Sequence, residues 1–99
     1  MHLSESEIKG IKAICKDYRV KHLYAFGSIL GDFFSPENDI DFLVEIDISD
    51  PYEYTDLYYG LLSELERFLD RRIDLLEVRA SRNEFIQSEI DKSKVAIYG

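Results

Sequence analysis

The chain has 99 residues, the length of one average domain, so we expect a single domain over residues 1–99. Its formal net charge is −8, from 20 acidic and 12 basic residues, which argues against stable nonspecific nucleic-acid binding and favours cationic partners and divalent metals. No apolar run approaches the ~20 residues of a membrane span, and the acidic N-terminal residues are unlike a signal peptide, so a soluble, cytoplasmic protein without membrane contact is expected.

The N-terminal segment predicts an amphipathic helix. Ser4 and Glu7 form a capping box, and apolar residues follow at intervals of three and four, which predicts a helix over residues 5–19. The single cysteine, Cys15, falls where this helix should face the core. We therefore expect it to be a buried structural residue and not a reactive thiol.

Two strands with a loop between them are predicted next. Residues 22–26 form a short apolar strand that ends at Gly27, and the segment 28–38 contains a helical turn and then loop-forming residues. Residues 39–47 alternate with a period of two, which predicts a strand with one apolar face packed inward. The outer side would carry Asp39, Asp41, Leu43 and Glu45, and the inner side Ile40, Phe42, Val44 and Ile46.

The second half of the chain alternates between helices and strands. Apolar residues at helical spacing predict a long helix over 54–69, and the segment 72–78 reads as a strand. Ser81 and Glu84 form a second capping box that opens another helix, and residues 95–98 can form a short closing strand. The order of elements predicts an α/β (α+β) domain in which a small mixed sheet is covered by helices.

Asp39 and Asp41 are the first candidate functional residues. On a strand their side chains point the same way, about 6.6 Å apart, so the two carboxylates can share a divalent cation. Without a cation they would repel each other beside an apolar core. Acidic pairs on exposed strand faces are common, however, and an ordinary solvated pair is the alternative interpretation.

Two further features favour a phosphate and metal site. Gly27-Ser28 closes the preceding strand, where backbone N–H groups and the Ser28 hydroxyl can approach a phosphate. Asp74 lies within the apolar run of residues 73–76, and a buried carboxylate is costly unless it is paired or binds a metal. An ion pair with a nearby arginine is the alternative, the candidates being Arg71, Arg72 and Arg79.

Together these residues resemble a known family signature. The chain contains Gly27-Ser28, ten intervening residues and then Asp39-Ile40-Asp41-Phe42-Leu43-Val44. This pattern resembles the core motif of the polymerase-beta-like nucleotidyltransferases, in particular the minimal nucleotidyltransferases (MNT), with Asp74 as the third acid. The resemblance implies the nucleotidyltransferase fold and Mg²⁺-dependent nucleotidyl transfer with two ions. It also implies that Asp39, Asp41 and Asp74 are the catalytic metal ligands and that Gly27 and Ser28 bind the nucleotide.

The resemblance also implies a partner. Minimal nucleotidyltransferases are commonly encoded beside HEPN-domain proteins as the antitoxin of a toxin–antitoxin pair. We therefore expect transfer of AMP from ATP to a hydroxyl, such as that of a tyrosine, on a HEPN toxin. Tyrosines cluster around the long helix and are enriched at interfaces, although ordinary half-buried tyrosines are the alternative; they are Tyr52, Tyr54, Tyr58 and Tyr59.

One departure from the family pattern keeps a second hypothesis open. The family usually carries an arginine just after Gly-Ser, whereas no basic residue lies between Gly27 and Asp39. Arg71 and Arg72 are candidates to replace it, with surface solvation as the alternative. The chain could then be a catalytically inactive binding module that neutralises its partner by contact. Transfer to a small molecule such as an aminoglycoside is a third reading.

Overall fold

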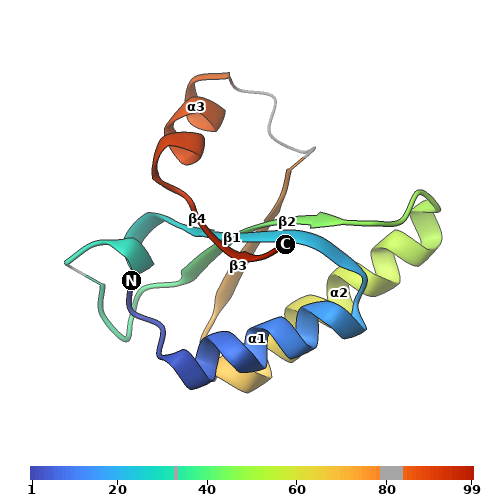
Figure 1. Cartoon of the computed structure of the whole chain (residues 1–99), viewed down its shortest axis with the longest axis horizontal. Coiled ribbons are helices and arrows are strands. Elements are labelled where there is room, and N and C mark those ends of the chain that lie inside the picture. Colours follow the sequence, from blue (N-terminus) through green and yellow to red (C-terminus); the bar gives the residue numbers. More distant parts are fainter. Residues whose placement is uncertain (33, 79–83) are drawn as a thin grey trace.

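The fold is described from a computed structural model, which defines residues 1–32, 34–78 and 84–99 (Figure 1). Its elements in chain order are α1 (Glu5–Asp17), β1 (Val20–Phe26), the 3₁₀ helix η1 (Gly27–Leu30), β2 (Ile40–Ile46), α2 (Pro51–Leu69), β3 (Ile73–Glu77), α3 (Glu84–Ser93) and β4 (Val95–Tyr98). No helix in this part of the chain combines the length and the apolar character needed to cross a membrane.

The strands form a four-stranded mixed sheet in the order β3-β2-β1-β4. Strand β1 is antiparallel to both β2 and β4, whereas β2 and β3 are parallel and are joined by α2. A parallel pair needs such a crossover, because a short hairpin can join only antiparallel strands. Helices α1 and α2 lie against one face of the sheet, and α3 lies on the other side (Figure 1). The predicted α/β architecture is therefore confirmed.

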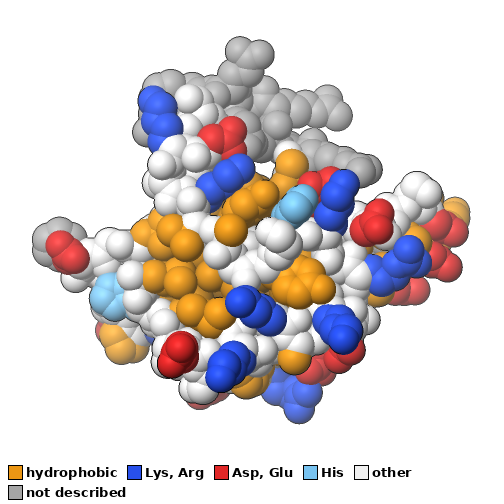
Figure 2. Space-filling model, in the orientation of Figure 1, with side chains coloured by type: hydrophobic (Ala, Val, Ile, Leu, Met, Phe, Trp, Pro, Cys, Tyr) orange, Lys and Arg blue, Asp and Glu red, His pale blue; other side chains and the backbone are white. Residues whose placement is uncertain are grey.

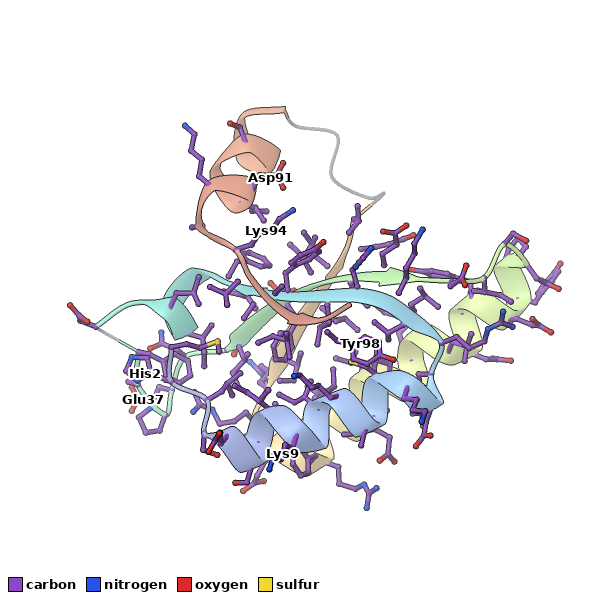
Figure 3. All side chains as sticks on the ribbon, viewed as in Figure 1. His2, Lys9, Glu37, Asp91, Lys94 and Tyr98 are labelled. Carbon is purple, nitrogen blue, oxygen red and sulfur yellow. The ribbon has the colours of Figure 1, made fainter. Side chains whose placement is uncertain are left out.

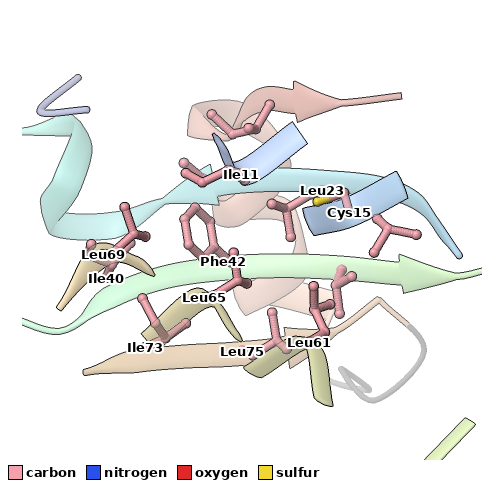
Figure 4. Close-up of a cluster of buried hydrophobic side chains, with 14 of the residues drawn as sticks. Ile11, Cys15, Leu23, Ile40, Phe42, Leu61, Leu65, Leu69, Ile73 and Leu75 are labelled. Atoms are coloured by element: carbon pink, nitrogen blue, oxygen red, sulfur yellow. The ribbon is translucent and has the colours of Figure 1, made fainter. Parts of the chain in front are cut away.

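The main core fills the space between the sheet and helices α1 and α2 (Figure 4). The predicted inner face of β2 is buried throughout, because Ile40, Phe42, Val44 and Ile46 each expose 3% or less of their surface. Cys15 is also fully buried, as expected. Burial of these apolar side chains is the main stabilising contribution to a domain of this size.

The opposite face of the sheet is less exposed than the alternation in β2 suggests. Leu43 was expected on the outer side with the acidic residues, but it is only 1% exposed. Leu43 and Ile90 of α3 are buried apolar residues that lie outside the main core cluster. Helix α3, which carries Ile90, lies on this side of the sheet (Figure 1), so the second face is not simply open to solvent.

Helix boundaries differ from the predicted ones for local reasons. Helix α1 ends at Asp17, two residues early, because the chain adopts a positive φ of 59° at Arg19. Helix α2 begins at Pro51, a turn before its apolar repeat, because the Asp50 side chain caps it by accepting from the Tyr52 N–H at 2.9 Å. The predicted cap at Ser81 lies outside the described residues.

Strand β3 lies at the edge of the sheet, with α2 beside it. Ile40 N–H donates to the Arg72 carbonyl at 3.0 Å, so alternate residues of β3 direct their backbone groups towards β2 and the others outwards. Two of the outward groups are paired with side chains of α2. The Ile73 N–H donates to Glu66 Oε2 at 3.2 Å, and the Leu75 carbonyl accepts from the Tyr58 hydroxyl at 2.5 Å.

Candidate active site

Asp41 and Asp74 meet on the face of the sheet that looks away from α1 and α2. They are register partners in the parallel β2–β3 pair, so both side chains leave the sheet on the same side. Asp41 is half-buried, whereas Asp74 is exposed. The expectation that the apolar run around Asp74 would bury it is therefore wrong. The alternation of β3 sends its neighbours Ile73 and Leu75 into the core and Asp74 to the opposite side.

The Asp41 carboxyl lies close to other acidic side chains. Its pKa is raised from 3.8 to about 6, first because burial removes water, and then because Asp74 and Asp39 carry like charges and Asp74 shares a side-chain hydrogen bond with it. A raised pKa means that ionising Asp41 is costly in the absence of a cation. This set of oxygen donors therefore fits a divalent metal ion, which would remove the repulsion.

Gly27 lies against the same carboxylate. Its φ of 76° is in the left-handed region that glycine adopts readily, and a Cβ at this position would collide with Oδ2 of Asp41. The register explains the contact, because Phe26, the last residue of β1, is the partner of Asp41 on β2. Glycine is therefore required here both by the backbone and by the space that Asp41 occupies.

Ser28 and Asp39 lie beside Gly27 and Asp41. The half-buried Ser28 donates its hydroxyl hydrogen to the Asp39 backbone oxygen at 3.5 Å, a long bond that links the turn to the start of β2. The Asp39 carboxylate is exposed and acts on Asp41 through its charge. Among residues 1–32, 34–78 and 84–99, no group of three His, Cys, Asp or Glu side chains could by itself hold a metal ion. A metal would therefore need oxygen ligands from the substrate as well, which is the usual way in which Mg²⁺ binds with nucleotides.

Arg71 holds the loop that leads into β2. Its Nη2 donates to the Ser35 carbonyl at 2.8 Å and to the Asn38 carbonyl at 2.6 Å, and its guanidinium lies 4.5 Å from the centre of the Phe34 ring. The idea that Arg71 is solvated on the surface is therefore wrong. Sequence reasoning missed this role because it depends on the parallel pairing of β3 with β2, which no local pattern reveals.

The N-terminus fixes the other side of the Gly27–Leu30 turn. The backbone N–H of His2 donates to the Ile29 carbonyl at 3.1 Å. The ring Nε2 of His2 lies 2.6 Å from the Gly31 carbonyl oxygen (Figure 3 labels His2). Nothing in the local sequence pattern around His2 indicates this contact. The turn that bears Gly27 and Ser28 is thus held from both sides, by β1 and by the first residues of the chain.

A pocket of about 430 Å³ opens between α2 and the edge of β3. Its lining residues are Tyr54, Thr55, Tyr58, Tyr59, Leu75, Leu76 and Glu77. The pKa of Tyr58 is raised by burial and by the neighbouring Tyr59, Asp74 and Glu77. Within the tyrosine cluster, Tyr52 and Tyr59 are exposed, whereas Tyr54 and Tyr58 are half-buried, and a role of the exposed pair at an interface stays a prediction.

Comparison with known proteins identifies the family. The family model described as "Polymerase beta, Nucleotidyltransferase" matches residues 9–99. The chain belongs to this family. The prediction from Gly27-Ser28 and the Asp39/Asp41 pair is therefore confirmed at the level of the family.

Individual relatives agree with this assignment. A Methanocaldococcus jannaschii protein named "Putative protein adenylyltransferase MJ1379" is 32% identical over 97 residues, which cover 93% of this chain and 96% of that protein. A crystal structure of a toxin–antitoxin with AMP-PNP matches with a TM-score of 0.71 and 21% identity, over 93% of this chain and 73% of that one. A structure of tri-AMPylated Shewanella oneidensis HEPN toxin in complex with MNT antitoxin matches with a TM-score of 0.66 and 20% identity, over 96% of this chain and 71% of that one. At these identities the two structures establish a shared fold.

Proposed function

We propose that this nucleotidyltransferase is a Mg²⁺-dependent protein adenylyltransferase that transfers AMP from ATP to a tyrosine hydroxyl of a HEPN toxin and so acts as its antitoxin in the cytoplasm. The observation that carries the proposal is the half-buried Asp41 carboxylate, which lies beside its register partner Asp74 and against Gly27. Carboxylates in such an arrangement are expected where a cation and a phosphate chain bind.

The named relatives support the finer parts of this proposal. The M. jannaschii protein is named for protein adenylyltransfer, one similar structure contains AMP-PNP, and another contains an AMPylated HEPN toxin with an MNT antitoxin. We transfer the nucleotide, the acceptor and the partner from these proteins to this chain. The acidic surface, with a net charge of −8, suits a basic partner.

The roles of the chain's own residues follow from their positions. Asp41 and Asp74, with Asp39 beside them, would hold two Mg²⁺ ions, which when bound neutralise the triphosphate and lower the pKa of the acceptor hydroxyl. Gly27 lets the backbone of the turn approach the phosphates, and the Ser28 hydroxyl can turn from the Asp39 carbonyl to donate to a phosphate oxygen. The acceptor oxygen loses its proton to solvent and bonds to the α-phosphorus, while the bond from the α-phosphorus to the bridging oxygen breaks and pyrophosphate leaves.

The test is label transfer from ATP to the partner. The chain is incubated with Mg²⁺, α-labelled ATP and the product of the neighbouring open reading frame, and the label on that protein is mapped by mass spectrometry. Wild-type protein should label a tyrosine and Asp41→Asn should not. Glu45→Gln is the matched control, because Glu45 lies on the same strand and is half-buried but pairs with Lys21 at 3.9 Å. Absence of transfer from every nucleotide tested would refute the enzymatic proposal.

Neutralisation by contact alone is the second candidate. It is favoured by the lack of a basic residue between Gly27 and Asp39 and by the lack, among the described residues, of a ready group of three metal ligands. Growth assays with the toxin separate the two candidates. If Asp41→Asn protects cells as fully as wild-type protein, the partner is neutralised by binding; if protection is lost while the complex still forms, it is neutralised by modification.

A further inference from the structure

Lys94 lies close to the candidate site although it is far from it in sequence. Val95 of β4 is the antiparallel partner of Ala25 on β1, so the residue before it, Lys94, comes next to Phe26. On the other side of β1, Phe26 pairs with Asp41. Lys94 and Asp41 therefore flank the residue that precedes Gly27, and two strand spacings separate their backbones by about 10 Å.

The Lys94 side chain extends over the same face of the sheet as Asp41. Its Nζ lies 4.4 Å from the centre of the Tyr24 ring, and Tyr24 is the register partner of Leu43, two residues along β2 from Asp41. The ammonium also lies 2.8 Å from Asp91 Oδ1, and the side chain is 26% exposed. Figure 3 labels Lys94 and Asp91, which project from the α3 end of the chain on the side of the sheet away from α1.

The site needs a cation that the turn itself does not provide. A triphosphate carries several negative charges, and the acidic residues around Asp41 repel it wherever bound metal does not compensate. No basic residue lies between Gly27 and Asp39, and Arg71 is engaged with two carbonyls of the loop before β2. A lysine ammonium is a common ligand for phosphate, and the register places Lys94 next to Phe26, the residue before the turn.

We propose that Lys94 is the triphosphate-binding cation of this site, taking the place of a basic residue in the turn. On binding, the ammonium exchanges Asp91 for a phosphate oxygen of the β/γ part of the nucleotide. The exchange costs little, because a partly exposed pair spaced by three residues is weak in water. This inference rests on the proposed function, since it assigns a ligand to the same site.

The test is direct binding, without any acceptor protein. Titration calorimetry with Mg²⁺ measures the dissociation constants for ATP, AMP and inorganic tripolyphosphate with wild type, Lys94→Gln, Lys94→Arg and Lys12→Gln. Lys12 is an exposed residue of α1, which packs on the opposite face and carries a row of basic side chains (Figure 2), so its variant makes the same charge change away from the site. Circular dichroism checks the fold of each variant, and Lys94→Met, which keeps the stem over Tyr24, replaces Lys94→Gln if that variant is unfolded.

We expect Lys94→Gln to bind ATP and tripolyphosphate about tenfold more weakly, the loss of one charge-assisted contact, while its affinity for AMP stays within about twofold. Lys94→Arg should retain most of the affinity, and Lys12→Gln all of it. Unchanged ATP binding by Lys94→Gln, or an equal loss for ATP and AMP, would overturn this inference and leave the proposed function standing. Wild-type protein that binds none of the three ligands would overturn the proposed function with it.

Discussion

The like charges around Asp41 predict that neutralising this residue stabilises the metal-free protein. The folded-state pKa of Asp41 is about 6 against 3.8 for the unfolded chain, so between these values the folded state holds more protons. The free energy of unfolding therefore falls as the pH rises from about 4 to about 6, and stays lower above that. Because the carboxyl is partly exposed, solvent screening reduces the effect, and we expect about 1 kcal/mol.

Asp41→Asn removes the destabilisation caused by the ionised Asp41 carboxylate, while keeping the shape of the side chain. In EDTA at pH 7.5 the variant should be about 1 kcal/mol more stable than wild type, which raises the midpoint of thermal unfolding by roughly 4–8 °C in a domain of this size. At pH 4, where Asp41 is largely protonated, the two proteins should unfold together. Added Mg²⁺ should stabilise wild type more than the variant, because the metal is expected to bind the ionised carboxylate.

Unfolding is followed by far-ultraviolet circular dichroism in heat and in urea, at both pH values and with and without Mg²⁺. Glu45→Gln serves as the control, since Glu45 is a carboxylate on the same strand that has a basic partner in Lys21. It should not gain stability at pH 7.5. An Asp41→Asn variant that is less stable than wild type at pH 7.5, or equally stabilised at pH 4, would show that the crowding of carboxylates does not raise the free energy of the folded state.

Further predictions concern the backbone around the site and are checked by urea unfolding at neutral pH. Gly27→Ala should cost about 1–3 kcal/mol, because of its positive φ and the contact with Asp41, and should abolish nucleotide binding; retained binding would contradict the assigned contact. Arg71→Met should cost about 1–3 kcal/mol by leaving two loop carbonyls without their charged donor, and should increase hydrogen exchange in residues 35–39; unchanged exchange would count against this role. Tyr58→Phe should cost about 1 kcal/mol through loss of the bond to Leu75, and no measurable cost would mean that water replaces it freely.

Sequence patterns predict the elements of this fold better than they predict its contacts. The period of two in residues 39–47 identifies β2 and its buried face, and the apolar repeat over 54–69 identifies most of α2, because both patterns follow from local backbone geometry. Leu43 was expected on the outer side with the acidic residues, because alternation cannot show that a helix lies on the second face as well. The start of α2 was placed too late because the cap at Asp50 lies outside the apolar repeat.

The contacts within the candidate site were also predictable only in part. Gly27 and Asp41 lie near each other in a motif with fixed spacing, and antiparallel pairing of β1 with β2 brings them into contact. Asp74 was correctly grouped with Asp41, but its burial was misjudged, because an apolar run does not show which residues of an edge strand face the core. Arg71 and Lys94 were beyond prediction from sequence, since their positions depend on how β3 and β4 pair with strands distant in the chain.

The side chains that α2 places along β3 have a consequence for how the molecule meets other proteins. With the Ile73 N–H held by Glu66 and the Leu75 carbonyl held by Tyr58, an incoming extended segment would have to displace both side chains before it could add to the sheet. Copies of the chain are thereby discouraged from joining edge to edge along these residues. A partner that docks beside Asp74 will be recognised by the shape and charge of the side chains there. Backbone hydrogen bonds from the partner will contribute little, because the outward backbone groups of Ile73 and Leu75 are already paired.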